Sequence, residues 1–180
     1  MRARLPDREG VIQCDGVRVA FEVVGHGEPA LLLIPASPIT HARSWKGIVP
    51  ALARRFTIVT TDGRGTGRSD RPRTPERYTP AEVTADLLAV LDAASVDQAV
   101  LVAHCHAVPW ALRLAAPLAC PVLVMHGTQD AVRSYAEGEA LADCTGGALV
   151  SLAGAGHFPQ ARDPVRVNLL IKQFADRFGR

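Results

Sequence analysis

The sequence predicts an α/β fold in which helices cover both faces of a mostly parallel sheet. Two observations support this prediction. Short, continuous apolar runs, typical of strands that are buried on both faces, alternate along the chain with segments of helical spacing. The composition, 180 residues of which 48% are hydrophobic and 21% charged, is that of an ordinary globular domain. We therefore expect residues 1–180 to form a single domain with three layers, α/β/α.

The first predicted element is a β-hairpin. Residues 11–23 contain two β-rich arms around Asp15-Gly16, a dipeptide that favours a tight turn, and we expect two antiparallel edge strands. The runs Ala30–Ile34 and Phe56–Thr60 have the apolar and β-branched residues of buried parallel strands. Between these two runs, apolar residues at helical spacing predict a helix over Trp45–Arg54.

The alternation of strands and helices continues to the end of the chain. Thr79-Pro80-Ala81-Glu82 is a capping box with proline at the first helical position, so a helix is predicted to begin there. The other predicted elements are, in order, a strand at Ala99–Ala103, a helix from about Cys105 to Ala116, a strand at Pro121–His126, a helix at Tyr135–Cys144, a strand at Ala148–Leu152 and a helix after Asp163-Pro164. This order predicts parallel pairing with helices on both faces.

Charge and composition limit the classes of partner. The net charge of +2 is small and the basic residues are scattered, so we expect a small-molecule substrate and neither nucleic acid nor a membrane surface. No apolar run approaches the roughly 18 residues of a membrane span, and the charged segment Met1–Gly10 lacks a signal-peptide core, which predicts a cytoplasmic protein. The four cysteines show no CxxC spacing, so we predict neither a disulfide framework nor a zinc knuckle. We also expect no metal and no cofactor.

The segment Ala103-His104-Cys105-His106-Ala107 has the pattern of a nucleophile elbow. It lies between an apolar run and a predicted helix, and alanines stand two residues before and two residues after Cys105. An elbow needs small residues there because the strand bends sharply into a helix and holds its nucleophile in a strained backbone conformation. The dipole at the helix N-terminus also stabilises a thiolate. The pattern favours a catalytic Cys105, although a lone cysteine at a strand end is usually structural.

Polar residues follow several predicted strands, at the edge where open α/β sheets collect their functional groups. These residues are Pro35-Ala36-Ser37-Pro38 after one strand, Cys105 after another, Asp130 after Met125-His126-Gly127, and His157 after Gly154-Ala155-Gly156. A nucleophile, an acid and a base therefore occur in that order along the chain. The alternative for Asp130 is a structural role as a helix cap or turn residue.

These motifs resemble those of the α/β-hydrolase superfamily. Besides the elbow, three segments are similar: Asp62–Asp70 after an early strand, His126–Asp130 around the acid, and Gly154–His157 around the base. The resemblance covers nearly the whole chain, and four motifs in the right order are more specific than any one of them. It implies an α/β-hydrolase fold.

The resemblance also implies roles for individual residues. By this resemblance, Cys105 is the nucleophile, His157 is the general base and later the general acid, and Asp130 orients the imidazole. The backbone N–H groups of Ser37 and His106 would bind the oxyanion of a tetrahedral intermediate. Both are main-chain donors, so the identity of their side chains matters little.

The chain departs from the family after the elbow helix. Family members generally continue with another strand, a lid or cap and a further helix, whereas here Ala115-Ala116 runs through Pro117-Leu118-Ala119 directly into the next predicted strand. If that strand fills the vacated position, Asp130 moves about 4.8 Å towards the nucleophile strand. If it does not, a gap leaves buried backbone groups unpaired at about 1 to 3 kcal/mol each. We therefore expect a closed sheet, reduced by one strand and the cap, with a shallow, open site.

Other polar residues near these motifs have simpler interpretations. His104 and His106 flank the cysteine, but adjacent side chains on a tight turn point apart, which disfavours a metal site. The segment Gly63–Gly67 lacks the glycine spacing and the lysine of phosphate-binding loops, so its glycines are better explained by tight turns. Trp45 either faces the pocket or packs in the core, and we expect His126 to be buried and hydrogen-bonded.

The sequence leaves three functional hypotheses open. The leading one is a hydrolase that acts on small activated esters, thioesters or lactones through a Cys105 acyl-enzyme. The alternative is a catalytically silent α/β-hydrolase-fold remnant that binds a small ligand or a protein partner, including a homodimer formed through surface that the missing cap exposes. The third is an internally shortened enzyme that folds only in part.

Overall fold

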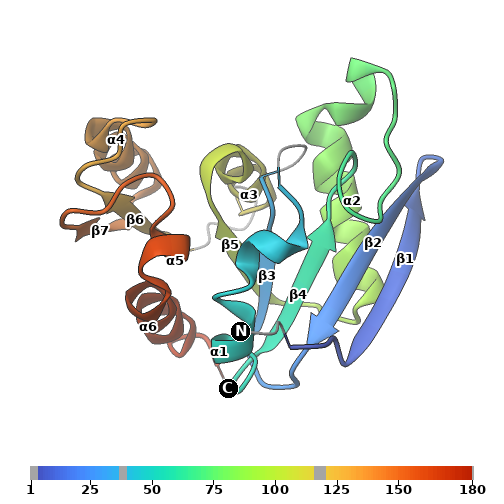
Figure 1. Cartoon of the computed structure of the whole chain (residues 1–180), viewed down its shortest axis with the longest axis horizontal. Coiled ribbons are helices and arrows are strands. Elements are labelled where there is room, and N and C mark those ends of the chain that lie inside the picture. Colours follow the sequence, from blue (N-terminus) through green and yellow to red (C-terminus); the bar gives the residue numbers. More distant parts are fainter. Residues whose placement is uncertain (1–3, 37–39, 116–120, 180) are drawn as a thin grey trace.

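The chain folds into a five-stranded mixed sheet, with a separate two-stranded sheet beside it (Figure 1). This computed structural model describes residues 4–36, 40–115 and 121–179. The larger sheet has the strand order β1-β2-β4-β3-β5, and the smaller sheet pairs β6 with β7 in parallel. The strands are β1 (Arg8–Cys14), β2 (Val17–Val24), β3 (Ala30–Ile34), β4 (Thr57–Asp62), β5 (Ala99–Ala103), β6 (Leu123–Gly127) and β7 (Ala148–Leu152).

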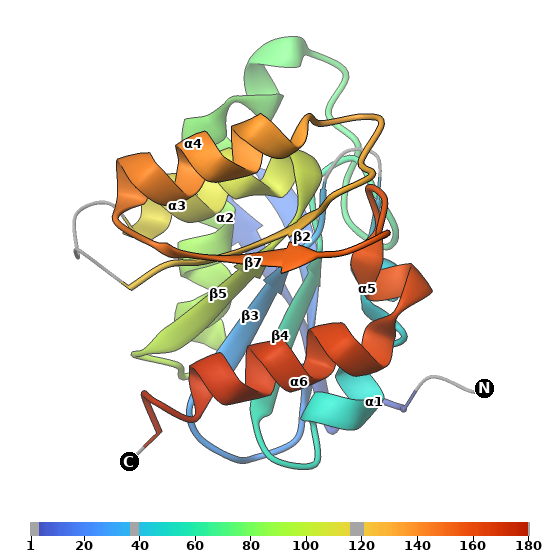
Figure 2. The same cartoon turned by 90° about the vertical axis from the view of Figure 1, so that its left-hand side faces the viewer.

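Helices cover both faces of the larger sheet. The α-helices are α1 (Val49–Leu52), α2 (Pro80–Ala93), α3 (Val108–Ala115), α4 (Tyr135–Thr145), α5 (Pro159–Arg162) and α6 (Pro164–Ala175). The short 3-10 turns are η1 (Ala42–Trp45), η2 (Pro75–Tyr78) and η3 (Cys105–Ala107). Leu31 and Leu33 of β3 share a core cluster with α1 and α6, whereas Leu32 and Ile34 share another with α2. Successive strand residues point to opposite faces, so a continuous apolar strand needs both layers. Figure 2 shows these layers, and the predicted α/β architecture is confirmed. No helix in the described ranges is long and apolar enough to cross a membrane.

The predicted hairpin is confirmed, with its turn at Asp15-Gly16. β1 and β2 pair in antiparallel register up to Cys14 opposite Val17, which leaves Asp15 and Gly16 as the two turn residues. Their φ angles of 46° and 77° are both positive, as a two-residue type I′ turn requires. The prediction that both strands lie at the edge is wrong, because β2 also pairs with β4 and only β1 is the edge strand.

The prediction of one helix over Trp45–Arg54 is wrong in its extent. This range contains the end of η1 and the four-residue helix α1, with a break between them. The physical reason is Pro50, which has no N–H to donate to a preceding carbonyl and therefore stands in the first turn of α1.

The helix predicted to begin at Thr79-Pro80 is confirmed as α2, and it also anchors the loop after β4. Thr79 Oγ1 accepts the N–H of Glu82 at 3.3 Å, as a capping box requires. The Glu82 carboxylate instead binds Arg64, whose completely buried guanidinium also donates to both oxygens of Asp86 at 2.7 and 2.8 Å. Burial alone would lower the pKa of Arg64, but these carboxylates outweigh it and raise the pKa. Arg64, the arginine of this glycine-rich loop, therefore pairs with carboxylates inside the protein.

The prediction of a closed sheet is wrong. β5 is the last strand of the larger sheet and β6 belongs to the smaller one, so the two strands do not pair. β6 pairs with β7, whose Leu152 is buried in the same cluster as Val167 and Ile171 of α6. Figure 1 shows the smaller sheet apart from β5, although Leu152 and Val102 of β5 belong to the same core cluster as α6. The junction 116–120, on which that prediction depended, lies outside the described residues.

Candidate active site

The turn between β5 and η3 holds Cys105 in a left-handed backbone conformation. Its φ is 53°, a value that residues other than glycine rarely adopt, whereas His104 before it is extended with φ −140° and ψ 156°. Ala107, two residues later, is completely buried, so a larger side chain there would displace the core beneath the turn. The strained conformation that the elbow pattern predicts at Cys105 is confirmed.

Asp130 and His157 form a hydrogen-bonded pair. Nδ1 of His157 lies 2.9 Å from Oδ2 of Asp130, and the side chains are 12% and 6% exposed. The other carboxylate oxygen accepts the backbone N–H groups of Val132 and Arg133, at 2.8 and 3.0 Å. Burial alone would raise the pKa of Asp130, but these hydrogen bonds and the nearby imidazole outweigh it and lower the pKa. The ionised form of Asp130 is thus favoured, and it is hydrogen-bonded to the His157 ring.

The parallel strands β6 and β7 bring these two residues together. Gly127 lies opposite Leu152, so the loops that follow the two strands start side by side. Gln129 N–H donates to the Ala155 carbonyl at 2.9 Å, and Thr128 N–H donates to the Leu152 carbonyl at 3.1 Å. A Cβ atom on Gly127 would lie 2.3 Å from the Ala155 carbonyl oxygen, so this close approach requires glycine.

Cys105 reaches the same region without a hydrogen bond to His157. In the part of the chain that the structure describes, its Sγ atom has no hydrogen-bond partner. Phe158 connects the two sides instead: the rings of His157 and His104 both pack edge-on against it, with centroid distances of 4.8 and 5.6 Å. The structure therefore brings the predicted acid and base into contact and links them to the elbow through aromatic packing.

His104, directly before Cys105, is a histidine whose two ring nitrogens are buried without a partner among the described residues. Its ring packs edge-on against Trp45, with centroids 5.0 Å apart. Burial, and then the nearby His157, lower the pKa of His104 to about 4, so this ring is neutral near pH 7. Sequence reasoning considered His104 only as a metal ligand, and the signal that it missed was the position of His104 directly before Cys105. Trp45 is 2% exposed and packs in the core.

One of the two predicted oxyanion donors lies within the described residues. The N–H of His106 follows Cys105 in the first turn of η3, and within those residues it donates to no group outside that turn. It is therefore available to a negatively charged oxygen beside Cys105. Ser37, the other predicted donor, lies outside the described residues.

His126 lies on the other side of Asp130. Its Nε2 is 3.2 Å from the Arg133 carbonyl oxygen and 3.6 Å from Oδ2 of Asp130, and the side chain is 13% exposed. The expected hydrogen bond of His126 is confirmed, whereas its side chain is half-buried and not fully buried. Its approach to the same carboxylate oxygen that binds His157 was missed, because it depends on how the loop after β6 folds back. Within residues 4–36, 40–115 and 121–179, no three His, Cys, Asp or Glu side chains are arranged to hold a metal ion.

Comparison with known sequences identifies a family. The family model described as alpha/beta hydrolase fold matches residues 26–117, just over half of the 180 residues, a range that includes the elbow but neither Asp130 nor His157. "Probable oxidoreductase EphD" of Mycobacterium tuberculosis is 42% identical over 78 residues, which are 43% of this chain and 13% of that protein. Epoxide hydrolase A of the same species is 36% identical over 98 residues, 53% of this chain and 30% of that protein. The chain thus spans less than a third of the length of these curated relatives.

Solved structures have the same fold. Est816, described as an N-acyl homoserine lactone degrading enzyme, matches with a TM-score of 0.83 and 22% identity, covering 92% of this chain and 100% of that one. The meta-cleavage product hydrolase from Pseudomonas fluorescens matches with a TM-score of 0.83 and 16% identity, covering 94% and 98%. At these identities the likeness concerns the fold alone. With the family model matching more than half of its residues, the chain belongs to the alpha/beta hydrolase fold family.

Proposed function

We propose that the protein hydrolyses small activated esters, thioesters or lactones through an acyl-enzyme on Cys105. The observation that carries this proposal is the Asp130–His157 hydrogen bond after β6 and β7, together with the strained elbow conformation of Cys105 after β5. A carboxylate, an imidazole and a nucleophile together perform acyl transfer on several unrelated folds. Membership of the family, and hydrolases among the named relatives, support a hydrolytic reaction.

The proposed mechanism starts from the tautomer of His157. When Asp130 accepts a hydrogen bond from Nδ1–H, the lone pair on Nε2 is free to take the thiol proton of Cys105. The thiolate attacks the substrate carbonyl carbon, and the electron pair of the C=O bond moves to the oxygen, which the His106 N–H stabilises. The bond to the leaving atom then breaks, and that atom takes the proton from His157. Water, deprotonated by His157, attacks the thioester, which releases the acid and restores the thiol.

Epoxides, which the names of two relatives suggest, fit a cysteine nucleophile less well. Attack of a thiolate on an epoxide carbon breaks the C–O bond and forms a thioether with a neighbouring hydroxyl group. A thioether has no carbonyl carbon for water to attack, so the enzyme would stay alkylated, whereas an acyl thioester is hydrolysed at its carbonyl. The chemistry of Cys105 therefore favours acyl substrates over epoxides.

Hydrolysis of a chromogenic short-chain ester tests the proposal. We expect Cys105→Ala and His157→Ala to lower the rate at least about 10²-fold. Cys144→Ala, which removes an exposed cysteine on α4, should keep the parent rate and serves as the control. Mass spectrometry of the parent after rapid acid quenching should show the acyl group on the peptide that contains Cys105. Equal rates in the parent and Cys105→Ala would refute the proposal.

The alternative, a catalytically silent protein, is favoured by one observation. In the described residues Cys105 Sγ has no hydrogen bond to His157, and a thiol needs such a contact to lose its proton to the base. Alkylation of Cys105 by iodoacetamide at neutral pH distinguishes the two cases. In the catalytic case His157→Ala slows alkylation, and in the silent case the rate does not depend on His157.

A further inference from the structure

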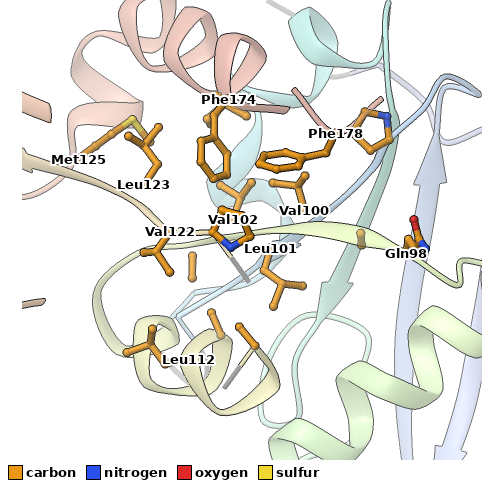
Figure 3. A pocket seen from close by; sticks show the side chains of 17 residues that line it. Gln98, Val100, Leu101, Val102, Leu112, Val122, Leu123, Met125, Phe174 and Phe178 are labelled. Carbon is orange, nitrogen blue, oxygen red and sulfur yellow. The ribbon is translucent and has the colours of Figure 1, made fainter. Parts of the chain in front are cut away.

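An apolar slot separates the two sheets. It is a cavity of about 300 Å³ between β5 and β6 (Figure 3). Apart from Gln98, every residue that lines it is apolar, and none is charged. Cys105, Asp130 and His157 do not line the slot, so the proposed chemistry does not account for it.

The slot follows the edge of β5 and not one of its faces. All five residues of β5, Ala99 to Ala103, line it, although successive side chains of a strand point to opposite faces. Leu123 and Met125 of β6 line it from the other side. Among the described residues, β5 is the last strand of its sheet and β6 pairs only with β7. Two strand edges, with the backbone N–H and C=O groups that point outward from them, therefore face the slot.

Helices cover the slot on both sides of the sheet. In Figure 3, Leu112 of α3 lies on one side of β5, and Phe174 and Phe178 lie on the other. An occupant in line with β5 and β6 would therefore contact apolar side chains on both of its faces. A strand in such surroundings is a continuous apolar run, because neither of its faces meets water.

We propose that the slot binds an extended, uncharged apolar peptide segment of a partner protein, added as a strand between β5 and β6. Such a segment continues the hydrogen-bond ladder of β3 and β5, and it satisfies backbone groups at the strand edges that are costly when buried unpaired. β5 and β6 have five residues each, so the occupant is a run of similar length. A hydrocarbon or a fatty acid would fill the apolar space but leave both strand edges unpaired.

Occupation of the slot also connects the two parts of the proposed site. β5 leads into Cys105, whereas β6 leads into the loop that carries Asp130 and binds His157. A strand paired with both would set the distance between the thiol and the imidazole. This consequence rests on the proposed function, whereas the binding itself does not.

Titration with a synthetic peptide tests the binding. The probe is a fluorescein-labelled peptide with a central Val-Ile-Val-Leu-Val run between pairs of lysines, followed by fluorescence anisotropy. We expect saturable binding with a stoichiometry of one. The same peptide with N-methyl groups on alternate backbone nitrogens keeps its side chains but loses donors, so it should bind at least tenfold more weakly. Slower amide exchange in β5 and β6 on addition of the first peptide is the second readout.

Two matched variants show where the peptide binds. Leu112→Asp introduces a charge into the slot and should weaken binding at least tenfold, whereas Leu88→Asp, at a 51% exposed leucine of α2 outside the slot, should not change it. Circular dichroism checks that both variants fold. Equal affinity for the N-methylated peptide overturns the proposal in favour of a small apolar ligand. Unchanged amide exchange in β5 and β6 also overturns it, and so does self-association that protects these strands without peptide.

Discussion

Three imidazoles of the candidate site, those of His157, His126 and His104, differ in what their nitrogens contact. His157 uses Nδ1 to bind the carboxylate, and His126 directs Nε2 to the Arg133 carbonyl and the same carboxylate oxygen. His104 packs between aromatic rings, and its nitrogens have no partner among the described residues. Because an unpaired buried polar group costs about 1 to 3 kcal/mol, His104 lowers the stability of the elbow that it supports.

Acidification should destabilise the protein through His104. Burial, and then His157, lower the pKa of this ring from 6.5 to about 4, so between these values the unfolded chain binds more protons than the folded one. The free energy of unfolding should therefore fall as the pH drops through this window, by up to about 1.4 kcal/mol per pH unit from this group. Asp130, whose pKa is lowered, loses its stabilising contribution only at lower pH. Urea denaturation at pH 7, 6 and 5 measures the effect.

His104→Phe is the matched variant for this prediction. It keeps a ring against Trp45 and Phe158 but has no nitrogen to protonate or to leave unpaired. We expect a flatter dependence of the unfolding free energy on pH between 7 and 5, and higher stability at the acidic end. The same slope in the parent and in His104→Phe would show that other groups cause the acid sensitivity.

A small epoxide should inactivate the protein stoichiometrically and should not be turned over. The thiolate of Cys105 opens the ring and forms a thioether. Because the thioether has no carbonyl carbon, water activated by His157 cannot hydrolyse it. Mass spectrometry should show one adduct on Cys105, and chromatography should show no catalytic release of diol. Exposed Cys144 in the same sample reports the background reactivity of an ordinary thiol. Repeated diol formation would contradict the cysteine mechanism.

Among the connections between elements, the ion pair between Arg64 and Asp86 ties the loop after β4 to α2. The Arg64 and Asp86 side chains are 0% and 5% exposed, whereas that of Glu82 is 27% exposed. Asp86→Ala leaves a buried guanidinium without its two-oxygen partner and should cost about 3 to 5 kcal/mol. Glu82→Ala should cost about 1 kcal/mol or less, because water reaches that end of the pair. Chemical denaturation of both variants checks the order, and similar losses would contradict it.

The approach of the acid and base loops depends on Gly127 at the end of β6. Gly127→Ala would bring a Cβ atom to 2.3 Å from the Ala155 carbonyl oxygen and push the two loops apart. We expect lower stability and at least about tenfold slower ester hydrolysis, since small displacements of catalytic groups are costly. Gly156→Ala is the control, because its Cβ atom would meet only the Gln129 carbonyl oxygen at an ordinary 3.8 Å. Equal effects of the two substitutions would show that the close approach is unimportant.

Over the whole molecule, local patterns predicted individual elements better than the relation between the two sheets. β3, β5 and β7 have the predicted bounds, because each is an apolar run between clear breaks. The elbow conformation at Cys105 also followed from a short motif. The separation of β5 from β6 did not, because no local pattern encodes how distant segments pack, such as Leu152 of β7 in one cluster with α6, β3 and β5. The prediction of a closed sheet considered only the hydrogen bonds between strand backbones.

This separation predicts that the two sheets open with different free energies. β3 lies between β4 and β5, and its Leu31, Leu32 and Leu33 are completely buried, whereas β6 has one strand neighbour and is mostly half-buried. In native-state hydrogen exchange, amides of β6 and β7 should show an opening free energy at least about 2 kcal/mol below that of β3, which corresponds to roughly thirtyfold faster exchange.

Leu152→Ala locates the contact that holds the smaller sheet. Leu152 is 1% exposed and belongs to the cluster that contains Val167 and Ile171 of α6, so the substitution removes about 2 to 5 kcal/mol from the attachment of β7. Exchange in β6 and β7 should then become faster still, while exchange in β3 should change less. The contrary outcome is that β3 and β6 have the same opening free energy as each other, both in the parent and in Leu152→Ala. The two sheets would then unfold as one unit. The slot between β5 and β6 would then be a rigid part of the fold, already shaped before any strand enters it.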